Sequence, residues 1–197
     1  MNSNPQAGLF EAGPFIEGLG KALKGVVRVI GSRKASTYMS CGWLITDSLV
    51  VVPEYAVQHD GMISCEVEEE KDAPRITAMR EEHIPSAIVA GGIGVLRLKE
   101  ALRGRALSLE ARTPTPDTSL CILQMLERRM FGFAGDLSID DQWLIYTCGE
   151  ELGSAGSPVV DTSTWAVVGM HAPLGTRTGR QRALRLDTLL KMLRPAK

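Results

Sequence analysis

The sequence predicts an all-β protein with one short helix near each end of the chain. Three observations carry this prediction. Short apolar runs of strand length recur along most of the chain, turn-forming residues separate them, and only two segments have apolar residues at helical spacing. Many short strands with turns between them are typical of a β-barrel or a β-sandwich.

The predicted strands are rich in Val, Ile and Leu, and Gly, Pro, Asp or Ser bound most of them. They cover residues 26–30, 40–46, 49–52, 63–67, 75–80, 93–98, 120–126, 136–139, 143–148, 158–160 and 166–170. The second and third of these strands form a predicted hairpin around Asp47 and Ser48.

Two segments predict helices. Phe15, Ile16, Leu19 and Leu23 fall at helical spacing after Pro14, which suits a first turn, so we expect a helix over residues 14–24. Residues 1–13 have no period and are predicted to form a flexible tail. Leucines from 184 to 193 also recur at helical spacing, which predicts a C-terminal helix over residues 184–194.

Composition excludes several classes of protein. The chain has 197 residues, 44% of them hydrophobic, with a net charge of −1, so bulk charge argues against nucleic acid or an anionic membrane as a partner. No run approaches the roughly 20 apolar residues of a membrane span. The polar start has no signal peptide and the four cysteines lack metal-ligand spacing. We therefore expect a cytoplasmic protein with free thiols and neither a metal ion nor another cofactor.

The most informative segment is residues 153–158 (GSAGSP), which two predicted strands follow, the second ending at Gly169-Met170-His171. This segment resembles the nucleophile loop of trypsin-like (chymotrypsin-fold) serine proteases, with Ala155 at the position of the nucleophile. Two further segments resemble the same family, in the same order. Residues 41–45 and 49–57 resemble the strand pair that leads to the catalytic histidine, which places Tyr55 at that position. Residues 92–98 resemble the segment that carries the catalytic aspartate, which places Gly92 there.

The resemblance covers nearly the whole chain and implies a fold of two six-stranded antiparallel β-barrels with a C-terminal helix. It implies a first barrel over residues 25–105, a connector over 106–117 and a second barrel over 118–183. Trypsin-like catalysis needs a hydroxyl nucleophile, an imidazole base and a carboxylate. Tyr55, Gly92 and Ala155 supply none of these groups. The chain is therefore expected to be a pseudoprotease, not an enzyme, which acts as a protein-binding adaptor or regulatory module in a larger, bacterial assembly.

Other features of the family's site are retained, and the resemblance implies a role for them. The backbone N–H groups of Gly153 and Ala155 correspond to the oxyanion hole, which needs no side chains. Gly149, Glu150, Glu151 and His171 correspond to the specificity pocket, so a peptide-binding groove is expected to persist. Pro173 lacks the N–H that would pair with a peptide strand there.

Two alternatives stay open at this point. The chain is a serine protease or other hydrolase whose nucleophile has been replaced by alanine and whose base is non-standard, or it is a purely structural domain with a filled groove. His59 and His83 are the other histidines that a displaced base would require. A histidine and a carboxylate within hydrogen-bond reach of residue 155 would favour the enzyme.

Overall fold

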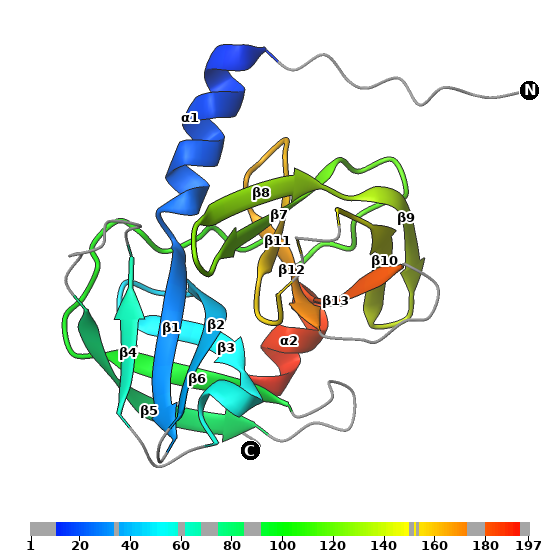
Figure 1. Ribbon diagram of the computed structural model, residues 1–197. Helices are drawn as coiled ribbons and strands as arrows, with labels where there is room; N and C mark the ends of the chain where they lie inside the picture. The colour runs from blue at the N-terminus through cyan, green and yellow to red at the C-terminus, as the bar shows by residue number, and fades with distance from the viewer. Residues whose placement is uncertain are drawn as a thin grey trace, which may run out of the picture.

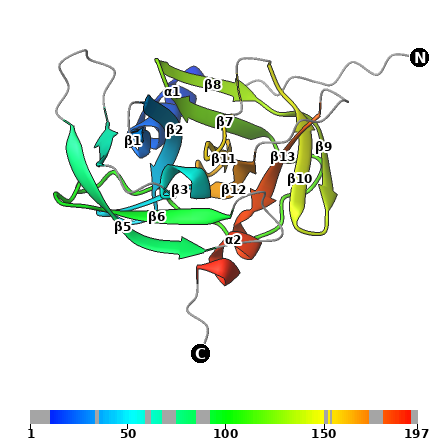
Figure 2. The ribbon, with the colours of Figure 1, turned by 60° about the horizontal axis from the view of Figure 1, so that its bottom comes forward.

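The computed structural model of the chain describes residues 11–33, 36–58, 62–67, 75–84, 92–149, 152, 154–172 and 180–193. Two β-barrels lie side by side, with a helix at each end of the described chain (Figures 1 and 2). No helix among the described residues is long and apolar enough to cross a membrane. The four cysteines are unpaired, and three of them are buried.

Six antiparallel strands close the first barrel in the order β1-β2-β3-β6-β5-β4, with β4 paired to β1. Their bounds are β1 (Val26–Arg33), β2 (Ser36–Leu44), β3 (Leu49–Pro53), β4 (Ile63–Glu66), β5 (Ile76–Ile84) and β6 (Ile93–Leu98). The barrel interior is apolar because alternate residues of each strand point inward, as Val27 and Val29 of β1 do. A single-turn 3-10 helix, η1 (Glu54–Ala56), follows β3.

Seven strands form the second sheet, in the order β8-β7-β11-β12-β13-β10-β9. Their bounds are β7 (Leu120–Met125), β8 (Arg129–Phe133), β9 (Gly135–Asp140), β10 (Trp143–Thr147), β11 (Pro158–Asp161), β12 (Val167–Ala172) and β13 (Gln181–Arg185). Ala134 alone separates β8 from β9, so the two ends of the sheet are consecutive in the chain and the sheet curls back on itself.

The largest apolar cluster lies between the two barrels. Trp43 and Val51 from the first barrel pack with Leu123 and Met170 from the second, and all four are essentially fully buried. Every residue of β7 is buried because β7 contributes both to this cluster and to the interior of the second barrel. Packing between the barrels therefore sets how their facing loops meet.

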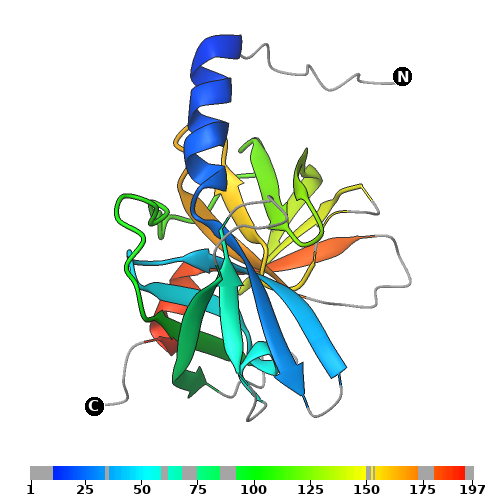
Figure 3. The same ribbon diagram turned by 60° about the vertical axis from the view of Figure 1, so that its left-hand side comes forward.

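The two helices occupy different environments. α2 (Leu186–Met192) follows β13 directly and packs on β12 and β13. α1 (Ala12–Leu23) precedes β1, and its N-terminal end projects beyond the strands of the barrels (Figures 1 and 3).

The all-β, double-barrel prediction is confirmed, but the second sheet has seven described strands where six were expected. β8 was not predicted, because Arg128 and Arg129 at its start, together with Gly132, resemble a turn. The predicted helix over 184–194 is wrong at its start: Leu184 and Arg185 belong to β13, which pairs with both β10 and β12, and α2 begins at Leu186. The second barrel accordingly extends past 183, and the first helix begins at Ala12, within the predicted tail, rather than at Pro14.

Candidate functional site

The segment Ser154–Ser157 forms a tight loop that packs against the first barrel. Gly156 has a φ of +90°, and a Cβ atom there would lie 2.2 Å from the carbonyl oxygen of Cys41 and 2.6 Å from Pro53 Cδ. The backbone N–H of Gly156 donates to the carbonyl of His171 at 3.0 Å. Only glycine satisfies both the positive φ and the close approach, which explains this residue at this position.

Ala155 lies in this loop with 8% of its surface exposed, between Ser154 and Gly156 in the chain. The hydroxyl oxygens of Ser154 and Ser157 are 3.0 Å apart. Burial raises the pKa of the Cys41 thiol to about 11, although hydrogen bonds from the Met125 backbone and from the two serines oppose this shift. The thiol therefore stays protonated, and unreactive, at neutral pH.

Tyr55 lies on η1, and its hydroxyl donates to Ser40 Oγ at 3.0 Å. Burial raises the pKa of this hydroxyl above its ordinary value, so the phenol is neutral near pH 7. The ring remains 38% exposed. In this state Tyr55 is a hydrogen-bond donor and not a base.

Gly92 lies beside η1, at the start of β6. Its carbonyl accepts the backbone N–H of Glu54 at 3.2 Å, and its φ is +86°. The next residue, Ile93, pairs with Pro53 in the ladder between β3 and β6. Because Pro53 also contacts Gly156, the structure brings together the three segments that carry Tyr55, Gly92 and Ala155.

The residues predicted to form a specificity pocket are only partly described. Gly149 is exposed, whereas Gly153, Glu150 and Glu151 lie outside the described residues. His171 is 1% exposed, and its Nδ1 lies 2.7 Å from the hydroxyl of Tyr146. Burial lowers the pKa of His171 to about 4, so the ring is a neutral, interior partner of Tyr146.

The two histidines considered as displaced bases cannot be placed against the loop. His59 lies outside the described residues, and the described part of His83 is its backbone in β5. Among the residues that the structure describes, no group of three or more His, Cys, Asp or Glu side chains is arranged to hold a metal ion.

The sequence analysis did not identify Gln124, whose side chain holds the loop through a hydrogen bond. Its side chain is 3% exposed, and its Oε1 accepts the backbone N–H of Ser154 at 2.9 Å. Apart from Cys121, Gln124 is the one polar residue in the apolar run of residues 120–126. A single amide side chain in an otherwise apolar strand was the signal in the sequence that could have indicated its role.

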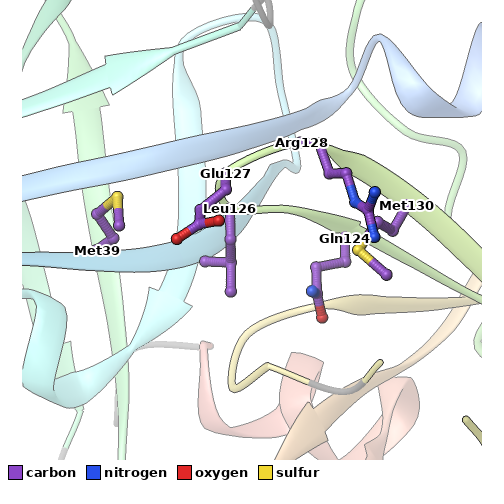
Figure 4. Close-up of a pocket in the computed structure, with 6 residues that line it drawn as sticks. All are labelled: Met39, Gln124, Leu126, Glu127, Arg128 and Met130. Atoms are coloured by element: carbon purple, nitrogen blue, oxygen red, sulfur yellow. The ribbon is translucent and has the colours of Figure 1, made fainter. Parts of the chain in front are cut away.

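Next to this contact is a pocket of about 600 Å³ between β2 and the β7–β8 hairpin (Figure 4). Three apolar side chains and three polar ones line this β2–β7 pocket: Met39, Leu126 and Met130, and Gln124, Glu127 and Arg128. Met39 is 46% exposed. Flexible thioether side chains adapt to different apolar partners, so the lining suits a variable apolar group.

Met39, which lines the pocket, also lies on a stretch of β2 that pairs with one described strand only. The N–H of Leu44 donates to the carbonyl of Gly25, so in the regular β1–β2 ladder the even-numbered residues of β2 bond to β1 and the odd-numbered ones face away. β3 pairs with β2 only at Trp43 and Leu44. Among the described strands, Met39 pairs with β1 alone, and its N–H and C=O point to the opposite edge.

Comparison with known proteins supports the fold and nothing finer. No protein-family model matches the chain, and no curated protein matches it in sequence. Among solved structures, the protease Rv3671c in an inactive form is similar with a TM-score of 0.71, at 13% identity, over 90% of this chain and 91% of that one. The chain thus has the double-barrel fold of trypsin-like proteases.

Proposed function

We propose that this chain is a catalytically inactive domain of trypsin-like fold that binds a segment of a protein partner, as an adaptor or regulatory module. One observation carries the proposal. The three segments that would hold a catalytic triad converge, yet the residues at the three positions are Tyr55, Gly92 and Ala155.

The chemistry around the loop supports inactivity. Acyl transfer needs a nucleophile and a base that accepts its proton near neutral pH. Ala155 has no hydroxyl, and the neutral phenol of Tyr55 donates its hydrogen bond to Ser40. The neighbouring Cys41 thiol is held protonated by burial. None of these groups can start the reaction.

Binding is supported by the β2 edge at Met39, which pairs with β1 alone among the described strands, and by the β2–β7 pocket, which Met39 also lines. An extended peptide gains affinity by hydrogen bonding to an open strand edge, and specificity from side chains placed in adjoining pockets. The main chain of Met39 offers the edge, and the pocket offers an apolar surface with Glu127 and Arg128 at its rim. We infer that the partner segment is extended and carries an apolar side chain at the position that enters the pocket.

Selection from a random peptide library tests this function on the full chain. We expect apolar-containing peptides whose binding falls about tenfold or more in Met130→Asp, because a carboxylate in the pocket would be desolvated by the ligand. Met62→Asp is the matched control: Met62 is 74% exposed and lines a different pocket, on the outer side of the first barrel, so binding should not change.

Two outcomes would contradict the proposal. Peptides that bind Met130→Asp and the wild type equally well would remove the pocket as the binding site. Turnover of casein by the wild-type chain, abolished by Tyr55→Phe, would show an enzyme with a non-standard base, which is the alternative that the intact loop backbone leaves open.

A further inference from the structure

One face of α1, which carries Phe15, Gly18 and Ala22, packs against the rest of the chain. A Cβ atom at Gly18 would lie 2.0 Å from Trp165 Nε1, so the helix backbone rests directly on that ring. Phe15 packs edge-on against Trp165 at 5.1 Å between ring centroids and lies 5.9 Å from the ring of Phe133. Ala22 is buried.

A different face of α1, which carries Ala12 and Ile16, is exposed, Ile16 at 65% of its surface. Figures 1 and 3 show the N-terminal end of the helix projecting beyond the strands of both barrels. α1 has 12 residues, contains three glycines, and has no side-chain hydrogen bond at its N-cap. Each of these features weakens an isolated helix, so α1 depends on packing for its stability.

Apolar residues form a continuous seam along one side of the helix. Ala12, Ile16, Leu19 and Leu23 are spaced by four, three and four residues, which is the spacing that packs one helix against another. We call these four residues the α1 seam. Leu19 and Leu23 are only partly buried against the core, and Phe131 and Phe133 on neighbouring β8 are 45% and 46% exposed.

The α1 seam is complementary to itself in the antiparallel direction. The spacing is the same read from either end, so an antiparallel copy places Ala12 opposite Leu23 and Ile16 opposite Leu19. The small side chain of Ala12 then meets the larger one of Leu23 at the C-terminal end of the helix, beside the barrels. This direction also places the two bodies at opposite ends of the helix pair, with Ile16 of each helix against Leu19 of the other.

The charges of α1 favour the same direction. Glu11 and Glu17 lie toward the N-terminus of the helix, whereas Lys21 and Lys24 lie toward its C-terminus. A parallel pair would bring like charges level with each other, and an antiparallel pair brings the acidic half level with the basic half. Exposed charges contribute little to affinity, enough to select a direction but not to drive association.

From these observations we propose that the α1 seam binds the α1 seam of a second copy of this chain, giving an antiparallel, two-fold symmetric homodimer. This surface is separate from the β2–β7 pocket, and the proposal does not depend on the function assigned to that pocket.

Analytical ultracentrifugation of the full chain tests the dimer. At concentrations up to about 100 µM, far above a micromolar dissociation constant, we expect a species of twice the 21.3 kDa monomer mass. Ile16→Asp should sediment as a monomer, because a two-fold interface would bury its carboxylate twice. Met62→Asp, an equally polar change at a 74% exposed methionine on the first barrel, should remain a dimer. Circular dichroism should show that both variants are folded.

Cysteine cross-linking tests the direction in a Cys148→Ser background, which removes the one cysteine that is not fully buried. A mixture of Ala12→Cys and Leu23→Cys chains should form a mixed disulfide dimer. Ala12→Cys alone should not, since its two copies would lie about 16 Å apart along the helix pair. A monomeric wild type, an Ile16→Asp variant that still dimerises, or cross-linking of Ala12→Cys with itself would overturn the proposal.

Discussion

The second-barrel side and the first-barrel side of the site differ in which groups hold them in place. On the second-barrel side, the loop at Ser154–Ser157 keeps a tight backbone that is fixed by Gly156 and by hydrogen bonds to β12 and Gln124. On the first-barrel side, Tyr55 is tied to Ser40, and Gly92 contributes only its backbone. The backbone of such a site thus depends on packing between the barrels and not on reactive side chains, so its presence alone does not show catalysis.

The largest effect should follow from disturbing the loop. Gly156→Ala requires a side chain at positive φ and a contact with the Cys41 carbonyl that no Cβ can make, so we expect a loss of about 3 kcal/mol or more in the free energy of unfolding. Gly104→Ala is the control, because Gly104 also has a positive φ (+70°) but open space around it, and should lose about 1–2 kcal/mol. Equal losses in urea titrations would show that the loop is not held against the first barrel.

His171, in the interior of the second barrel, should make the free energy of unfolding depend on pH. His171 has a pKa of about 4 in the folded protein, against an ordinary value of 6.5, so the unfolded chain binds a proton that the folded chain excludes. The contribution of neutral His171 is complete above pH 6.5 and is lost as the pH falls toward 4, by up to about 3 kcal/mol. His171→Gln should lack this part of the slope in unfolding titrations from about pH 7 to 4. Parallel slopes for both proteins would contradict the buried, neutral ring.

Alanine substitutions at two glycines of α1 should change the stability of the protein in opposite directions, because only one of these glycines contacts the second barrel. Gly18→Ala places a methyl group into the ring of Trp165 and should cost about 2 kcal/mol. Gly20→Ala adds a methyl group into open space and should stabilise the protein by about 0.5–1 kcal/mol, because alanine favours a helix. Thermal unfolding of the two variants measures both effects, and a loss at both positions would show that the helix is packed differently.

The smallest effect should come from Tyr55, on the first-barrel side of the site. Tyr55→Phe removes only the hydrogen bond to Ser40 from a partly exposed ring, so we expect a loss of about 1 kcal/mol or less. Peptide binding at the β2–β7 pocket should be unchanged, as isothermal titration with a selected peptide can measure. A loss of binding as large as that of Met130→Asp would place the binding site at Tyr55 instead.

The short apolar runs predicted an all-β barrel or sandwich, because the strands that fill the barrels carry them, and the resemblance of three segments to trypsin-like proteases implied the two barrels. The prediction of individual elements failed for a strand with exposed side chains, β8, and at the boundary between β13 and α2. β8 exposes Phe131 and Phe133 and begins at Arg129, the second of two consecutive arginines, so it lacked the apolar run of a core strand. Leu184 fits the helical period of the leucines after it, yet it lies in β13 because pairing on both sides outweighs that local preference.

The sequence predicted the loop of the site, but not the long-range contacts and the pocket around it. Residues 153–158 identify the turn, because its glycines and serines form a recognisable local pattern. The approach of Gly156 to Cys41, the bond from Ser154 to Gln124 and the β2–β7 pocket join residues far apart in the chain, and no local pattern encodes them. Likewise His171 was expected beside a pocket, and its burial against Tyr146 depends on the packing of the barrel.

The central claim, that the site lacks a working base as well as a nucleophile, is tested most directly by labelling with a fluorophosphonate probe, which reacts with activated serines. The wild-type chain and Ala155→Ser should be compared at equal concentration with an active serine protease as the positive control. We predict that both stay unlabelled, because the positions of the base and the carboxylate hold the neutral phenol of Tyr55 and Gly92, which has no side chain. Labelling of the Ala155→Ser variant at the introduced hydroxyl would contradict this claim and would show an enzyme from which only the nucleophile is missing.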